Sequence, residues 1–270
     1  MRDILVHMDG TEQNKVRAEA ATQLAQRYEA HLTGLFVLAD PFIPIYDAAQ
    51  LPPEFYEEQE TLDKQRAEAA ENMFRGIAGP MGVSTEWRVD QGPKADVVAR
   101  HAHYCDLVIA GQRDPEQPVG GGVPDGLLLS IGRPILILPY VSQSADIGKR
   151  IMVAWNASPQ ATRAVHDAIP FMSQADHVDV IAINPNGSHG EIPCADISLH
   201  LARHGIKCEA QSITVNDIGV ADMLLSRAAD QSADMIVMGA YGHARWREWV
   251  FGGVTAHMLD HMTVPVLMAH

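Results

Sequence analysis

Glycines in the segment GAYGHARWREWVFGGVT give this chain its clearest candidate for ligand-binding chemistry. They form the pattern GxxG, nine residues, GG. A glycine lets the backbone approach a ligand without a Cβ clash, and a helix that begins after such a loop directs free N–H groups at an anion. The segment therefore predicts a phosphate-binding loop, unless these glycines only shape a tight strand-to-helix connection. The candidate contacts are Gly239, Gly242, Gly252, Gly253 and Val254.

The first half of the chain has a related but altered segment, GQRDPEQPVGG. Asp114 stands where the second glycine belongs, and Gly121 follows Gly111 by 10 positions, whereas Gly252 follows Gly239 by 13. A carboxylate there repels phosphate. We therefore expect the first half to hold no phosphate in this way, and its weaker candidate contacts are Asp9, Val37, Gly111 and Gly121.

Three common catalytic and nucleotide-binding motifs are missing from the sequence. It has no GxSxG elbow, no GxxxxGK[ST] loop and no SGGxDS-like pyrophosphatase loop. His200 and His204, like His257 and His261, are spaced i,i+4, but neither pair carries the Glu of an HExxH zinc motif. We assign no catalytic residue and no metal ligand, and we expect any hydrolysis of a bound phosphate ester to be slow.

The elements that must position these loops occur twice. RDILVHMDG at 2–10 matches KRIMVAWNA at 149–157, and GGGVPDGLLLSIGRPILIL at 120–138 matches FGGVTAHMLDHMTVPVLMA at 251–269. An internal repeat of this length indicates a duplicated domain. We predict domains at 1–141 and 149–270, joined by a linker at 142–148.

Each repeat alternates strands with helices, and strands such as DLVIAG and PILIL are apolar on both faces. Such strands are typical of buried parallel sheets, which predicts a doubly wound α/β fold. Its ligands bind outside the carboxyl ends of the strands, where the strand order reverses. The loops after the first strand, at Asp9 and Asn156, and after the fourth strand therefore define the expected sites.

Charge and composition limit the partners. The net charge of −14 and the lack of a basic patch disfavour nucleic acids and anionic membranes as partners. No run of 18 apolar residues occurs, and the chain opens directly in a strand pattern, so we expect neither secretion nor a membrane span. Three cysteines without CxxC spacing suit the reducing cytoplasm.

Taken together, the repeat, the opening and closing strands and the GxxG, nine residues, G spacing resemble a tandem universal stress protein, with two UspA-like domains in one chain. The resemblance implies two Rossmann-like domains of the adenine nucleotide alpha hydrolase type, each a five-stranded parallel sheet flanked by helices. In the ATP-binding branch of this family, ATP, with Mg, would place its adenosine near Asn156 and Ile183. Two positions differ from the family pattern: Gly253 replaces a Ser or Thr, and Asn156 replaces an acidic residue.

The resemblance also implies a function: a stress-response regulator whose second domain binds ATP and thereby changes the surface offered to a protein partner. The alternatives are a nucleotide-independent scaffold or a weak ATPase. Because the family joins domains through their final strands, here PILIL and PVLMA, we expect an intrachain pseudo-dimer and, on top of it, a homodimer of chains.

Overall fold

In the computed structural model the described residues are 1–38, 52–113, 126–141, 146–184, 194–214, 218–242 and 253–270. The first domain contains β1 (Asp3–Met8), α1 (Asn14–Tyr28), β2 (His31–Leu38), α3 (Pro53–Ala78), the 3₁₀ turn η1 (Gly79–Met81), β3 (Thr85–Gln91), α4 (Lys94–Ala102), β4 (Leu107–Gly111), α5 (Leu127–Ser130) and β5 (Ile135–Leu138). The second contains β6 (Arg150–Ala154), α6 (Pro159–Met172), β7 (His177–Ile183), α7 (Ala195–Arg203), β8 (Glu209–Ile213), α8 (Val220–Asp230), β9 (Met235–Gly239), α9 (Gly253–His261) and β10 (Val266–Ala269).

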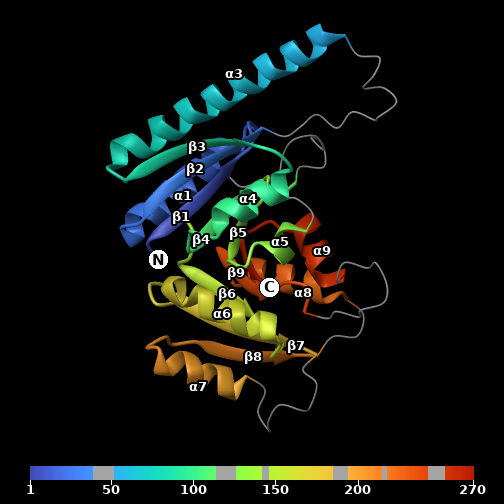
Figure 1. Cartoon of the computed structure of the whole chain (residues 1–270). Helices are drawn as coiled ribbons and strands as arrows, with labels where there is room; N and C mark the ends of the chain where they lie inside the picture. Colours follow the sequence, from blue (N-terminus) through green and yellow to red (C-terminus); the bar gives the residue numbers. More distant parts are fainter. Residues whose placement is uncertain (39–51, 114–125, 142–145, 185–193, 215–217, 243–252) are drawn as a thin grey trace.

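The strands form one ten-stranded sheet in the order β3-β2-β1-β4-β5-β10-β9-β6-β7-β8 (Figure 1). Within each half, all five strands are parallel. The predicted α/β class and the two five-stranded parallel units are therefore confirmed. The strand order reverses between β1 and β4 and again between β6 and β9, which gives two switch points per chain.

The two halves meet through their final strands, as the family resemblance implies. β5 and β10 run antiparallel, and Leu136 pairs with Leu267 at the centre of their register. All four residues of β5 and all four of β10 are buried. Because each of these strands covers the other's edge, neither is left as an open template for association.

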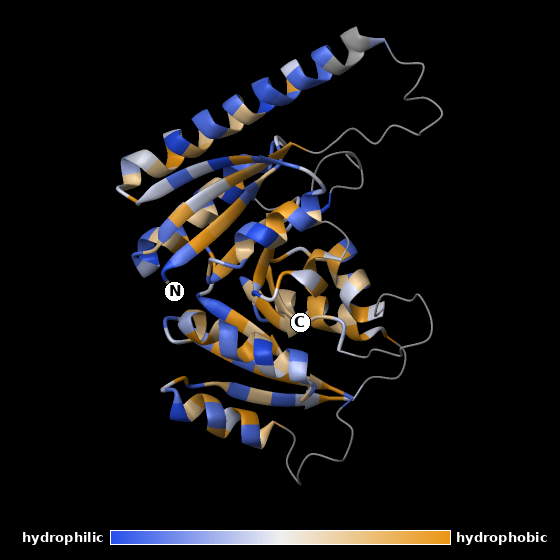
Figure 2. Ribbon diagram, viewed as in Figure 1, coloured by the Kyte–Doolittle hydropathy of each residue, from blue (hydrophilic) through white to orange (hydrophobic). Residues whose placement is uncertain are grey.

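Helices cover both faces of the sheet. α1, α3, α6 and α7 contribute buried residues to the apolar cluster on one face, and α4, α5, α8 and α9 contribute to the cluster on the other. The strands at the centre are the most hydrophobic part of the ribbon, whereas α3 is largely hydrophilic along its length (Figure 2). Among the described residues, no helix combines the length and the apolarity needed to cross a bilayer.

Candidate functional site

The loops after β1 and β6 have the same local hydrogen bond. The Asp9 side chain accepts from the Thr11 backbone N–H at 3.2 Å, and the Asn156 side chain accepts from the Ser158 N–H at 3.1 Å. Both are Asx turns, which Asp and Asn form with the backbone two residues on. The acidic residue expected after the first strand and the Asn that replaces it thus shape the loop in the same way.

A buried arginine fills the first switch point. Arg17 on α1 is only 2% exposed, and its Nη1 lies 2.9 Å from Asp9 Oδ2 and donates to the His7 carbonyl at 2.7 Å. The guanidinium also lies against the end of β4, since a Cβ on Gly111 would be 2.1 Å from Arg17 Nη2. The space between the carboxyl ends of β1 and β4 is therefore occupied by the chain's own Arg17 side chain.

The surroundings of Asp9 keep its carboxyl group ionised. Burial opposes ionisation of Asp9, but the Arg17 guanidinium, together with His7 and hydrogen bonds from Thr11, outweighs it and holds the pKa of this carboxyl well below its usual range. Next to the pair, the described residues leave a cavity of about 10 Å³, lined in part by Gln112 and Tyr140. Such a volume holds at most one water.

Of the remaining first-domain candidates, the two that the structure describes are buried. Val37 is buried near the end of β2, and Gly111 is covered by Arg17. Gly121 and Asp114 lie outside the described residues.

The second switch point lacks the arginine. By the match of the two repeats, Ala164 on α6 takes the place of Arg17. The helix is capped instead by Ser158, whose Oγ accepts from the Ala161 N–H at 3.1 Å, with Pro159 in the first turn. The Asn156 side chain is exposed at the mouth of this loop.

The GxxG turn after β9 packs onto this capped helix start. A Cβ on Gly239 would lie 2.5 Å from the Ala161 nitrogen, and one on Gly242 would lie 3.3 Å from both Ser158 Oγ and Gln160 Oε1. Gln160 Oε1 is buried and has no hydrogen-bond partner in the described part of the chain. A buried acceptor without a donor costs free energy, so it marks a place where a ligand donor is favoured.

The helix α9 begins at Gly253, and both Gly253 and Val254 are exposed. Among the described residues, nothing lies within 4 Å of the position that a Cβ on Gly253 would take. Thr255 is buried, and its hydroxyl accepts from the Tyr241 N–H at 3.1 Å, which ties the GxxG turn to the helix. The first N–H groups of this helix have no partner within it, as at any helix N-terminus, and they carry its positive dipole end.

The structure thus brings Asn156, Gly239 and Gly242 together at the carboxyl ends of β6 and β9. Ile183 lies one strand further out, half-buried at the end of β7, and packs against the apolar cluster of that face. Gly252 lies outside the described residues.

Sequence reasoning missed three residues that shape the two sites. Arg17 could have been found as a cation in phase with the buried alanines of α1, eight residues after Asp9. Gln160 carries no such signal. Gln112, which follows β4, bridges the halves: its Nε2 donates to the Leu259 carbonyl on α9 at 2.8 Å and its Oε1 accepts from the Tyr140 N–H at 3.1 Å.

Known proteins share this architecture. The chain resembles the crystal structure of a universal stress protein from Archaeoglobus fulgidus, with a TM-score of 0.79 and 16% identity over 99% of this chain and 95% of that one. A putative universal stress protein from Pseudomonas aeruginosa gives a TM-score of 0.64 at 15% identity, over 100% of this chain and 93% of that one. At these identities the likeness concerns the fold.

Sequence comparison gives the family. A curated universal stress protein, Slr1230 of Synechocystis, is 24% identical over 170 residues, which are 60% of this chain and 57% of that protein's length. The model of the universal stress protein family matches residues 1–139, nearly all of the first half, and residues 196–270, the later part of the second half. With its two UspA-like domains in one sheet, this chain belongs to the universal stress protein family.

Proposed function

We propose that this chain is a cytoplasmic stress-response regulator that binds one adenine nucleotide, ATP with Mg, at the switch point of its second domain. The first domain, with its buried Arg17 and Asp9, serves as the inert partner half. The observation that carries this proposal is the contrast between the copies. The buried Arg17 side chain fills the first switch point, whereas Ala164 stands at the matching position in the second domain.

The residues of the second switch point suit such a ligand. Gln160 Oε1 is a buried acceptor without a donor in the described residues, and the amino and hydroxyl groups of an adenosine are donors. The exposed start of α9 at Gly253 offers backbone N–H groups to a phosphate. In this proposal Asn156 and Ile183 lie on the adenosine side, and Gly239, Gly242, Gly252, Gly253 and Val254 on the phosphate side.

A bound nucleotide would supply negative charge, and Mg would neutralise part of that charge. The chain's own residues hold and orient it. The Asx turn of Asn156 fixes the first loop, and the bond from Tyr241 N–H to Thr255 fixes the GxxG turn against α9. We propose that occupancy changes the surface that a protein partner or a second chain meets. The boundaries 1–141, 142–148 and 149–270 remain our division of the chain.

A second candidate function is a nucleotide-independent interaction module. It is favoured by the packing of Gly239, where a Cβ would lie 2.5 Å from a backbone nitrogen, so that this glycine is needed by the fold whether or not a ligand binds. Gly242 is likewise close to Ser158 and Gln160. Substitutions at these two glycines would therefore alter folding as well as binding, and a loss of binding could not be assigned to the site.

Gly253 is the better position for separating the two functions, because a side chain there would meet none of the described residues within 4 Å. Gly253→Ser supplies the hydroxyl that the family pattern has, and one added hydrogen bond of about 0.5–1.5 kcal/mol strengthens binding roughly 2–13-fold. Gly253→Asp places a carboxylate at the phosphate position and should abolish binding.

Thermal melting of the wild type and both variants, with and without millimolar ATP and Mg, tests this proposal. We expect the melting temperature of the wild type to rise by a few degrees at saturating ATP, more for Gly253→Ser and not at all for Gly253→Asp. All three proteins should melt alike without ATP. No ATP-dependent shift in the wild type or in Gly253→Ser would instead favour the interaction module.

A further inference from the structure

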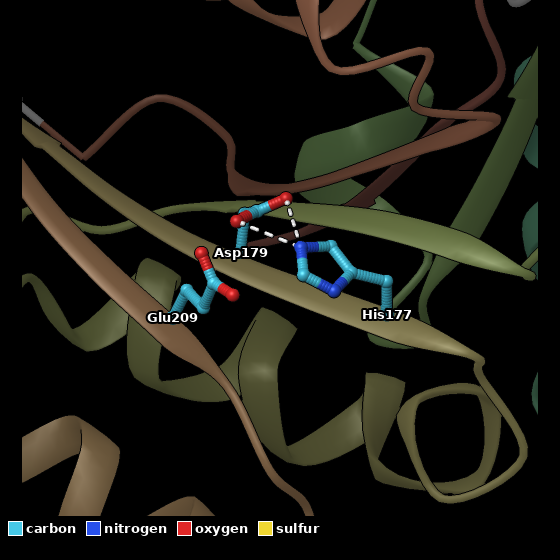
Figure 3. A group of neighbouring side chains, drawn as sticks. All are labelled: His177, Asp179 and Glu209. Atoms are coloured by element: carbon cyan, nitrogen blue, oxygen red, sulfur yellow. Dashed lines mark hydrogen bonds and ion pairs between the residues drawn. The ribbon is translucent and has the colours of Figure 1, made fainter.

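Three metal-ligating side chains meet on one face of the second domain. His177 and Asp179 are two residues apart on β7, so they point to the same side of the sheet. Asp179 is paired in register with Glu209 on the parallel neighbour β8. Figure 3 shows the imidazole and the two carboxylates turned toward one another. The three side chains come from two strands, which are rigid supports for a binding site.

Their spacing fits a single small cation. His177 Nε2 lies 3.2 Å from each carboxylate oxygen of Asp179, and one ligand atom from each of the three residues lies within 4.8 Å of the others. In a tetrahedral zinc site with bonds of about 2.0–2.1 Å, two ligand atoms are about 3.3–3.4 Å apart. The 3.2 Å between His177 Nε2 and the Asp179 carboxylate oxygens is close to this length, and a ligand atom of Glu209 lies within 4.8 Å of both residues.

The two neighbouring carboxylates of the cluster would be stabilised by a bound cation. Asp179 is 5% exposed, and like charges on directly adjacent strand positions destabilise a sheet. In the described residues neither Asp179 nor Glu209 forms an ion pair with a Lys or Arg. Arg150 is the register neighbour of His177 on β6, but its Nε–H donates to the Gln231 carbonyl at 3.0 Å and not to either carboxylate.

We propose that His177, Asp179 and Glu209 bind a divalent transition-metal ion, with Zn²⁺ the best fit. One imidazole and two carboxylates suit Zn²⁺ and its first-row neighbours, whereas Mg²⁺ and Ca²⁺ prefer oxygen ligands throughout. The cluster lies where β7 begins, at the opposite end of the sheet from the GxxG turn that follows β9. It is therefore separate from the proposed nucleotide site, and three protein ligands leave a fourth position for water.

Isothermal titration of the metal-free protein with ZnCl₂ tests the site, with the Co²⁺ absorption spectrum as a report of coordination. We expect Zn²⁺ binding to weaken at least tenfold in His177→Gln and in Glu209→Gln. Because Glu209→Gln removes one of two facing carboxylates, the melting temperature of its metal-free form should equal or exceed that of the wild type. A lower melting temperature or unchanged Zn²⁺ affinity in this variant would overturn the proposal.

A matched control comes from the other histidine cluster of the same domain. The rings of His166, His200 and His204 lie between α6 and α7, with centroids 4.8–6.2 Å apart. We expect His200→Gln to keep the Zn²⁺ affinity and the tetrahedral Co²⁺ spectrum of the wild type. Loss of both in His200→Gln would assign the metal to that cluster and contradict the site proposed on β7 and β8.

Discussion

Arg17 and Asp9 form a buried ion pair at the first switch point, with Nη1 of the arginine 2.9 Å from Oδ2 of the aspartate. Side-chain exposure is 2% for Arg17 and 0% for Asp9. The second domain has Ala164 and Asn156 at the matching positions. Two copies of one fold therefore differ at the point where such sheets bind ligands, and one copy is closed by its own side chains.

Removing the cation of this pair should destabilise the protein strongly. Arg17→Met keeps much of the side-chain volume but leaves a buried carboxylate without its partner, which costs about 3–5 kcal/mol. The double variant Asp9→Asn, Arg17→Met removes both charges and should regain most of that loss. Urea denaturation of wild type, single and double variants at pH 7 measures this. A double variant no more stable than Arg17→Met would contradict the account.

His7 should make the first domain sensitive to acid. It is 1% exposed, neither ring nitrogen has a partner among the described residues, and burial lowers its pKa to about 3, with Arg17 and Lys94 acting in the same direction and Asp9 against it. An unfolded histidine titrates near 6.5, so between pH 6.5 and 3 the unfolded chain binds more protons. Stability therefore falls as the pH falls through this window, by about 1.4 kcal/mol per pH unit.

The His7→Leu variant isolates this effect. Between pH 7 and pH 4.5 the wild type should lose about 3 kcal/mol more unfolding free energy than His7→Leu, as measured by urea denaturation at both values. The exposed His166 provides the control, because His166→Gln should keep the acid loss of the wild type. Equal acid losses in the wild type and His7→Leu would show that His7 is protonated in the folded state.

The loop between β6 and α6 carries backbone strain that its counterpart avoids. Ala157 has φ +57°, and the matching Gly10 has φ +77°. A left-handed conformation costs a residue with a Cβ about 1–2 kcal/mol, but glycine adopts it freely. We expect Gly10→Ala to lower the melting temperature and Ala157→Gly to raise it or leave it unchanged. Melting curves with the opposite order would contradict this assignment of the loops.

Gln112 should couple the two domains. Its amide bonds to the Leu259 carbonyl of α9 and to the Tyr140 N–H at 2.8 and 3.1 Å. Gln112→Ala leaves both backbone groups without that partner and should cost about 2–3 kcal/mol. Gln112→Glu keeps an acceptor for Tyr140 but faces a carboxylate toward Leu259, so it should be at least as destabilised at pH 7. Urea denaturation that finds either variant as stable as the wild type would exclude this bridge.

The sequence predicts the fold well because the repeat and the apolar strands can be recognised from local residue patterns. The alternation of strands and helices predicts the parallel units, and the family resemblance implies the pairing of β5 with β10 between them. The candidate site is predicted only in outline. The glycines and Asn156 can be recognised from spacing, but the buried Arg17 owes its place to packing between α1 and the ends of β1 and β4.

The metal cluster shows the same limit. Thirty-two residues of sequence separate His177 from Glu209, and only the register of β7 against β8 makes them neighbours. The i,i+4 pairs of histidines are visible in the sequence instead, and the ring centroids of His257 and His261 lie 4.1 Å apart as that spacing predicts. Cross-strand neighbours in parallel sheets have no such local signature.

The measurement that tests the central claim most directly is the stoichiometry of ATP binding in the presence of Mg, by isothermal titration. The account predicts one ATP per chain, a tighter site in Gly253→Ser and none in Gly253→Asp. Two ATP per chain would contradict the closure of the first switch point by Arg17. One ATP that still binds Gly253→Asp with wild-type affinity would contradict the placement of the nucleotide at the start of α9.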